Sequence, residues 1–341
     1  MTAPSLLTTM QQTHGRFQIV PPQHPEWAFE LVLPKEWLRI EPLPAAPANE
    51  LETQTLASFA SSAAPDAPQC LVTLSTTQFD IVLDVWSKQA ALRAGWTVVS
   101  GQWLPGPTGL YYDLTTTRGA GAKQWVRRTS VRAVHQAIFT THTSVKRADW
   151  NAFKESFFAT HTAFKLLHAE VDSSVERHLL VELNDPSFRL GYPESWVAEP
   201  VRLKQADVSD VHVRLTPGSN VRAALFVRAR RYRAAPPAIE TLENELGELA
   251  AESGAKLTAL PKQLASAEDP RAQAVQGWLG TYSADARLDN AEMTARLSLV
   301  RRGKITFSLL LVAPTLSEDI LVALRAQRAL EIVRASLDVT R

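Results

Sequence analysis

Apolar and polar residues alternate in the stretch FELVLPKEWL (29–38), which predicts a strand whose Phe29 points to a buried face. Pro34 has no backbone N–H and ends the strand ladder, so Trp37 can turn back to cover the sheet. The same spacing of Phe, Leu, Pro and Trp returns in FRLGYPESWV (188–197), 159 residues further along the chain. We interpret this frame as a core and turn signature rather than a ligand site.

The repeated frame is the first of an ordered series of matches between the two halves of the chain. Leu83 and Leu242 keep the offset of 159 residues, as do Gly95 and Gly254, whereas Phe139 and Phe307, and Gly109 and Gly277, match at an offset of 168 residues. The nine extra residues fall in the polar stretch SAEDPRAQA (266–274), where a loop tolerates insertion. A fold unit that occurs twice explains the whole series.

Four stretches carry apolar residues at the spacing of a helix. They are FDIVLDVWSKQAALRAG (79–95), WNAFKESFFATHTAFKLL (150–167), AIETLENELGELAAESG (238–254) and SEDILVALRAQRALEIVRASL (317–337). The first and the third end in glycine, the usual residue just past the C-terminus of a helix. Each half of the chain is therefore expected to contain a middle helix and a closing helix.

Strands are expected before and after each middle helix. In the first half they are Phe17–Val20, Phe29–Leu33, Cys70–Ser75, Trp96–Gln102, Tyr111–Thr117, Trp125–Val134 and Ala137–His142. Partial alternation and the short loops between these runs favour antiparallel hairpins. The predicted fold class is α+β, with two tandem copies of an antiparallel sheet flanked by helices. We place an N-terminal tail at 1–14, the first copy at 15–170 and the second at 175–341.

Composition describes an ordinary globular chain and excludes few classes of function. Of 341 residues, 45% are hydrophobic and 21% charged, and the net charge is +1, so no global field recruits nucleic acid or an anionic membrane. The single cysteine, Cys70, permits no internal disulfide and excludes a cysteine-rich zinc site. The first residues lack the basic segment and apolar run of a signal peptide, and no apolar run is long enough for a membrane span. We expect a cytoplasmic protein.

Motifs of known catalytic and metal sites are missing from the sequence. The loop GAGAK (119–123) lacks the second glycine and the following Lys-Ser/Thr of a phosphate loop, and a strand follows it. His161 and His168 lie seven residues apart, whereas ligand pairs on a helix are normally three or four apart. We therefore predict no catalytic residue, no metal and no cofactor, and a protein that is not an enzyme. An enzyme without a recognisable motif is the third hypothesis.

The strongest basic cluster is VRARRYR (227–233), where Tyr232 is interleaved with arginines. Its members Arg228, Arg230, Arg231 and Arg233 offer an alternative function, the binding of nucleic acid or another polyanion. The corresponding stretch of the first half, TLSTTQF (73–79), carries no basic residue, and no nucleic-acid-binding module is present. Nucleic acid is thus the less favoured partner.

Tryptophan is concentrated in the first half of the chain. Seven of the nine tryptophans lie there, at positions 27, 37, 86, 96, 103, 125 and 150. One domain of this size cannot easily bury so many indoles, and exposed aromatic residues mark protein interfaces. Tyr111 and Tyr112 point to opposite faces of a strand, so one of them is expected to face away from the core. Trp103, Tyr112 and Trp125 are the candidate partner-binding residues, and aromatics that fill the contact between the two halves are the alternative.

The order of these elements suggests a family. A strand that ends in a Pro-x-x-Trp turn, a middle helix, a run of antiparallel strands and a closing amphipathic helix resemble the fold shared by PsbP, DcrB and the Ran-binding Mog proteins. The resemblance covers the chain from about Gly15 onward, with the unit present twice. It implies a non-catalytic function, since members of this fold are mostly photosystem subunits, lipoproteins and the Eag chaperones of type VI secretion effectors.

Among these branches, the absence of a leader and of an early cysteine favours the Eag-type chaperones. They are similar in being homodimers whose paired sheets form a concave apolar surface, so a tandem chain implies a monomer with an internal pseudo-dimer. The leading hypothesis is a cytoplasmic protein-binding adaptor or chaperone, with an apolar effector segment of type VI secretion as a possible partner.

Overall fold

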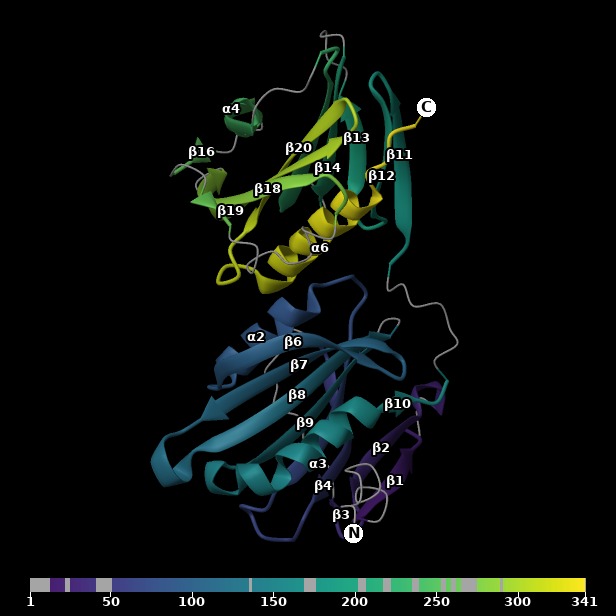
Figure 1. Ribbon diagram of the computed structural model, residues 1–341, viewed down its shortest axis with the longest axis vertical. Coiled ribbons are helices and arrows are strands. Elements are labelled where there is room, and N and C mark those ends of the chain that lie inside the picture. The colour runs from purple at the N-terminus through teal and green to yellow at the C-terminus, as the bar shows by residue number, and fades with distance from the viewer. Residues whose placement is uncertain are drawn as a thin grey trace, which may run out of the picture. The chain divides into compact units, whose positions relative to one another are not determined.

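The computed structural model describes residues 13–21, 25–40, 51–134, 137–168, 176–201, 207–216, 222–234, 239–252, 256–258, 262–264, 275–288 and 291–340. The chain divides into two compact units (Figure 1). Unit 1 comprises Met1–Gln78 and Leu83–Val175, and unit 2 comprises Phe79–Val82 and Glu176–Arg341. Each unit is built on one large antiparallel sheet.

The sheet of unit 1 has seven strands in the order β3-β4-β5-β9-β8-β7-β6. Their bounds are β3 (Leu38–Ile40), β4 (Thr53–Ala60), β5 (Gln69–Thr76), β9 (Ala137–Lys146), β8 (Trp125–Val134), β7 (Gly109–Arg118) and β6 (Thr97–Gly106). Every neighbouring pair is antiparallel. The short 3-10 helices η1 (Pro25–Trp27), η2 (Gly121–Lys123) and η3 (Arg147–Asp149) lie in connections of this unit.

A second layer of unit 1 covers one face of this sheet. It consists of β1 (His14–Ile19), β2 (Phe29–Pro34), β10 (Lys165–Leu166) and the helix α3 (Trp150–Ala163), which lies over the face of the sheet (Figure 1). Phe29 stacks on Phe164 with ring centroids 5.4 Å apart, and Phe157 is fully buried. Burying a side chain of this size contributes about 1.5–3 kcal/mol, so this layer holds the main core of unit 1.

The Phe-Leu-Pro-Trp frame packs in the core and forms a turn, as the sequence predicts. Phe29 is fully buried, and Pro34 is the last residue of β2. The N–H of Trp37 donates to the carbonyl oxygen of Pro34 at 3.1 Å, and the Trp37 side chain is buried. In unit 2 the N–H of Trp196 donates to the Pro193 carbonyl at 2.9 Å in the same way.

The helix α2 (Leu83–Arg93) covers the other face of the unit 1 sheet, where it contacts β6, β7 and β8. It ends at Gly95, whose φ of +76° is the left-handed conformation that glycine tolerates best. Because side chains alternate along a strand, Cys70 and Val72 of β5 join the core beneath α3, whereas Leu71 and Thr73 point to the α2 side.

Unit 2 contains a sheet with the order β13-β14-β15-β20-β19-β18-β16, and β17 also pairs with β18. The bounds are β13 (Val197–Val201), β14 (Val208–Leu215), β15 (Ala223–Arg231), β20 (Ile305–Pro314), β19 (Ala291–Arg302), β18 (Trp278–Leu288), β16 (Lys256–Leu257) and β17 (Lys262–Gln263). All of these pairs are antiparallel.

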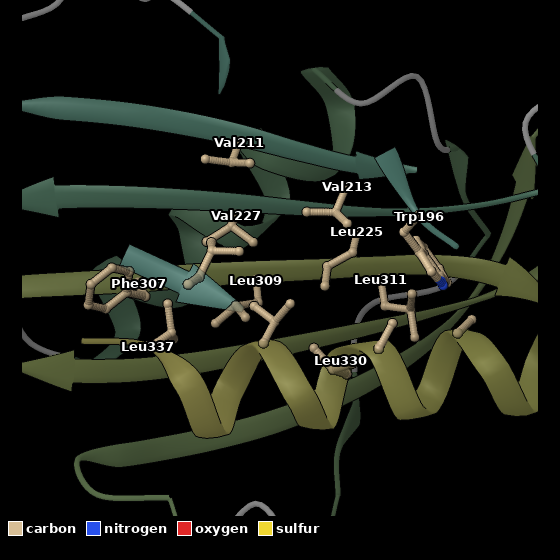
Figure 2. Packing of buried hydrophobic residues seen from close by; sticks show 14 of the residues in the cluster. Trp196, Val211, Val213, Leu225, Val227, Phe307, Leu309, Leu311, Leu330 and Leu337 are labelled. Carbon is tan, nitrogen blue, oxygen red and sulfur yellow. The ribbon is translucent and has the colours of Figure 1, made fainter. Parts of the chain in front are cut away.

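One face of this sheet packs against α6 (Ile320–Ser336) and the hairpin of β11 (His178–Asn184) and β12 (Ser187–Pro193). The Asp319 carboxylate caps α6 by accepting a hydrogen bond from the Val322 N–H at 3.1 Å. Figure 2 shows Leu330 and Leu337 directed toward the strands, with Trp196 at the end of the same layer. The opposite face is covered by α4 (Ile239–Glu252).

The structure confirms an α+β fold built mostly from antiparallel sheets. It corrects one detail of the sequence interpretation: Tyr111 and Tyr112 do point to opposite faces, yet both are buried, because helices cover both faces of the unit 1 sheet. Strand β4 is not among the predicted strands. The expected loop insertion at 266–274 and the glycine at 254 lie outside the described residues.

Candidate functional site

Strand β6 is one of the two edge strands of the unit 1 sheet, and it pairs with β7 alone within the part of the chain that the structure describes. Its sequence TVVSGQWLPG has no charged residue, although natural edge strands commonly carry charges that discourage pairing with another chain. Among the described residues, only two features of β6 oppose such pairing: a bulge between Val98 and Ser100, and the proline at 105. Val99, at the bulge, is 60% exposed.

Two predicted partner-binding residues meet on this edge. Trp103 of β6 and Tyr112 of β7 are directly paired across the strands, and their rings lie 5.4 Å apart. Gly101 makes room for the tyrosine, because a Cβ at that position would lie 2.0 Å from the Tyr112 hydroxyl. Trp103 is half-buried and thus partly accessible.

Tyr112 itself is 2% exposed, so the expectation of an exposed ring at this position is wrong. Helix α2 covers it, and the Lys88 ammonium lies 5.5 Å from the ring centroid. Burial raises the pKa of Tyr112, which keeps the hydroxyl protonated at neutral pH. Tyr112 therefore supports Trp103 from behind and offers little surface of its own to a partner.

The structure does not bring the third candidate, Trp125, to the same place. Trp125 begins β8 and pairs with Arg118, whereas Tyr112 pairs with Val131 of the same strand. Val131 lies six residue steps along β8 from Trp125, a distance of about 20 Å at the usual rise per residue. Trp125 is half-buried at the far end of the sheet.

The predicted basic cluster is not a single accessible surface. Arg228 is buried in the unit 2 sheet, where its guanidinium donates to both oxygens of the Asp210 carboxylate on β14, the shortest bond being 2.7 Å, and also contacts Glu252 of α4. The hydrogen bonds that Arg228 donates to Asp210 raise the pKa of Arg228, and Arg228 in turn lowers the pKa of Glu252. Arg228 is thus fully occupied within the fold.

The other three arginines of the cluster are spread over different surroundings. Arg230 is half-buried, Arg231 lies 4.0 Å from the Asp185 carboxylate, and the exposed Arg233 pairs with Asp207 at 2.9 Å. Carboxylates therefore offset part of the positive charge that a polyanion would need. The role of these residues in polyanion binding stays a prediction.

The buried histidines have structural partners. His161 of α3 accepts or donates hydrogen bonds at both ring nitrogens, to Thr143 at 2.8 Å and to Ser130 at 2.9 Å. Burial lowers the pKa of His161 and of His142 well below 6.5, so both rings are neutral at pH 7. The thiol of Cys70 is buried, which raises its pKa to about 12 and makes it a poor nucleophile.

No group of three metal-ligating side chains is assembled within the described ranges. None of the helices described combines the length and the apolar character needed to cross a bilayer.

The sequence interpretation missed a cavity in unit 1, which lies between α2 and the sheet. Its volume is about 200 Å³, and its sheet wall comes from β4, β5, β7, β8 and β9. This wall includes the side chains of Thr73, Thr116, Arg127, Thr140 and His142. The only sign of this cavity in the sequence is the presence of hydroxyl residues within strands, as in LTTT (114–117) and RRTS (127–130). These residues line one cavity only because the strands pair in register.

Comparisons with known proteins find structural likeness only. No protein-family model matches the chain, and no curated protein matches it in sequence. Solved structures with a similar fold include cyanobacterial PsbP (CyanoP) from Synechocystis sp. PCC 6803, at 15% identity over 45% of this chain and 92% of that one, with a TM-score of 0.34.

Two further similar structures are LpqN of Mycobacterium tuberculosis, which is involved in cell envelope biogenesis, and the type VI secretion immunity protein TplEi of Pseudomonas aeruginosa. LpqN is 12% identical over 49% of this chain and 99% of its own, with a TM-score of 0.32. TplEi is 8% identical over 96% of this chain and 99% of its own, with a TM-score of 0.23. The TM-scores of these structures all lie below 0.5, so the likenesses assign neither a function nor a partner.

Proposed function

We propose that the protein is a non-catalytic binding protein whose unit 1 takes up an extended segment of a partner protein along β6. The observation that carries the proposal is the edge strand itself: ten residues without a charge, paired on one side, with Val99 exposed and Trp103 partly accessible. A peptide that adds to such an edge gains main-chain hydrogen bonds, and alternate side chains contact the flanking surface.

The favoured occupant is an uncharged, mostly apolar segment. A charged segment would lose solvation against Val99 and Trp103 without an ion pair, because β6 supplies no charged side chain. An apolar segment of a type VI secretion effector, held in the cytoplasm by this chain as an adaptor or chaperone, meets these requirements. That assignment rests on the resemblance to the Eag-type chaperones.

We further infer that units 1 and 2 are two copies of one PsbP-like fold within a monomer. The strand orders β3-β4-β5-β9-β8-β7-β6 and β13-β14-β15-β20-β19-β18-β16 correspond strand for strand. In unit 1, Phe139 of β9 pairs with Leu74 of β5. At the corresponding position of unit 2, Phe307 of β20 pairs with Ala229 of β15. The second copy, in which β16 replaces β6 with only two residues, lacks the long edge strand.

Site-specific photocrosslinking in the native host tests the edge directly. A photoreactive amino acid in place of Val99 is expected to capture a defined partner, whose crosslinked peptide reads as an extended apolar segment. The matched control is the same residue in place of Val197, which is 51% exposed on the edge strand β13 of unit 2. Val99→Lys should weaken the interaction at least tenfold and leave the fold intact, since Val99 is exposed.

Three results would contradict the proposal. They are equal capture of the same protein from positions 99 and 197, the absence of a crosslink from position 99, and unchanged binding of the captured partner by Val99→Lys.

A further inference from the structure

The cavity of unit 1 has walls of opposite character. Helix α2 contributes the small side chains of Ala90 and Ala91, and Ala94 follows just past its end, so the space above the sheet stays open. Trp86 of the same helix and Leu114 of β7 add apolar surface. The sheet wall adds hydroxyl groups and one guanidinium, so a ligand in this cavity would meet apolar atoms on one side and donors on the other.

The positive charge in the cavity has no counter-ion among the described residues. Arg127 lies with its guanidinium carbon 3.9 Å from the centroid of the Trp96 ring, and no carboxylate lines the cavity. Its Nε is buried without a hydrogen-bond partner. Burial and the nearby Arg118 lower the pKa of Arg127 to about 10, which marks a charge that the fold solvates poorly.

Two hydroxyl groups of the same wall are also unsatisfied: Thr116, directly opposite Arg127, and Thr140, which is opposite Val131, four residues further along β8. Thr116, which pairs with Arg127 across the strands, is 1% exposed, and Thr140 is 5% exposed. Neither hydroxyl oxygen has a hydrogen-bond partner. Buried polar groups are nearly always paired, and exceptions require an explanation such as a bound ligand or solvent.

We propose that this cavity binds a small organic anion, a carboxylate with a compact apolar body of about the size of benzoate. Arg127 would pair with the carboxylate, Thr116 opposite it on β7 would donate to it, and the apolar body would lie against Trp86, Ala90 and Ala91 of α2. The size follows from the volume: the cavity's volume of about 200 Å³ exceeds the roughly 150 Å³ of an apolar protein cavity that accepts benzene.

The charge of Arg127, with no carboxylate in the lining and a neutral His142 beside it, favours an anion over a cation. The Nδ1 of His142 is hydrogen-bonded to Thr129 at 2.9 Å, and the adjacent Arg127 helps to lower the pKa of His142. A cation would face Arg127 with no carboxylate to offset the repulsion, which disfavours that class of ligand.

The corresponding positions of unit 2 show what this fold contains without a ligand site. Following the strand pairings, Thr116, Arg127, Thr129 and His142 correspond to Ala284, Ala295, Leu297 and Leu310. These four residues of unit 2 are buried members of one apolar cluster. Nothing in the architecture therefore demands an arginine and hydroxyls at this place, and the fold tolerates alanine at the position of Arg127.

Fluorine NMR of the full-length protein with 4-fluorobenzoate at pH 7.5 tests the proposal. We expect saturable 1:1 binding, and at least tenfold weaker binding of the neutral isostere 4-fluorobenzyl alcohol. Arg127→Ala should weaken binding of the anion at least tenfold. Ala91→Phe, which fills the space and leaves the charge, should abolish it. The exposed Arg16, which belongs to unit 1 but does not line the cavity, provides the charge-matched control Arg16→Ala, expected to bind as the parent does.

Several results would overturn the proposal. These are the absence of saturable binding of 4-fluorobenzoate, equal binding of the alcohol, and full binding by Ala91→Phe. Full binding by a folded Arg127→Ala variant would do the same. Inorganic phosphate that displaces 4-fluorobenzoate at equal concentration would also overturn it, because a bare anion would then suffice. None of these results bears on β6, since Val99→Lys is expected to bind 4-fluorobenzoate normally.

Discussion

The face of each sheet that lies beneath the middle helix differs in composition at equivalent positions of the two units. Beneath α2, unit 1 presents threonines, His142 and Arg127 around a cavity of about 200 Å³. Beneath α4, unit 2 presents Leu297, Leu310 and other apolar side chains that pack into one cluster. The same strand order thus supports both a polar hollow and a filled apolar layer, because the strands are held by backbone hydrogen bonds that do not depend on this face.

Two arginines, the buried Arg228 and the half-buried Arg127, sharpen the contrast. The charge of Arg228 in unit 2 is neutralised by Asp210, and both side chains of this ion pair are buried. Arg127 of unit 1 has no such partner among the described residues and stacks on Trp96 instead. A satisfied buried pair is a structural element, whereas an unsatisfied buried charge weakens the fold and calls for a functional explanation.

The largest difference is expected from matched arginine substitutions. Arg228→Met leaves the buried Asp210 carboxylate without its partner, so unit 2 should lose about 3–5 kcal/mol of stability. Arg127→Met leaves no partner behind and should change the stability of unit 1 by no more than about 1 kcal/mol. Hydrogen exchange read by mass spectrometry on peptides of β15 and β8 measures each unit separately.

The double variant Arg228→Met/Asp210→Leu is the control for this comparison, and it should recover most of the loss because no buried charge remains. Equal losses of stability in Arg228→Met and Arg127→Met would contradict the view that only Arg228 has a buried partner.

An intermediate difference in stability between the two units is expected when the pH is lowered. The unfolded chain protonates histidine near pH 6.5, whereas the fully buried His161 and the half-buried His142 have lowered pKa values and stay neutral in the fold. Stability that is present above pH 6.5 is therefore lost as the pH falls below it, by roughly 1–2 kcal/mol per histidine between pH 7.5 and 5.0. Urea denaturation at the two pH values, followed by hydrogen exchange in each unit, measures it.

The unit 2 residue at the same place supplies the control for acid sensitivity. His142→Leu introduces the residue type of position 310 and should reduce the acid sensitivity of unit 1. Unit 2 has its own histidine with a lowered pKa, His212, so it should lose less stability than unit 1 but not be insensitive. If the stability of His142→Leu depends on pH as that of the parent protein does, His142 has the same pKa in the folded and unfolded states, which would contradict the prediction.

The smallest effect is expected from a single hydroxyl. Thr116→Val keeps the shape of the side chain and removes a buried hydroxyl without a partner, so unit 1 should gain up to about 1 kcal/mol. Thr117→Val, on the next residue of β7 and half-buried, is the matched control and should stay near zero. A loss of stability in Thr116→Val, measured by hydrogen exchange of β7, would indicate that the hydroxyl is satisfied by solvent in the cavity.

Much of the local structure could be predicted from the sequence. The helices α2, α3, α4 and α6 lie within the stretches predicted from apolar spacing, and the Pro-x-x-Trp frame ends β2 and β12 as expected. Strand β4 (Thr53–Ala60) was not predicted, because TQTLASFA lacks a clear alternation of apolar and polar residues. The alignment of VRARRYR with TLSTTQF is one residue out of register, since the ladders match Arg228 to Thr73.

The candidate sites were harder to predict, because burial depends on what covers each face of the sheet. Trp103 and Tyr112 are paired, but α2 covers the tyrosine, and a strand pattern alone does not reveal which helix lies above it. In the same way, Arg228 looked like part of a basic surface until β14 placed Asp210 opposite it.

The sequence by itself determined the antiparallel α+β architecture, since the period of its apolar residues specifies strands and helices and its prolines and glycines end them. Only the tertiary structure decided which polar residues share a space. Thr116, Arg127 and Thr140 lie on three different strands, and the hydrogen-bonded register of those strands brings them to one wall beneath α2. Register depends on long-range pairing, which local patterns do not specify.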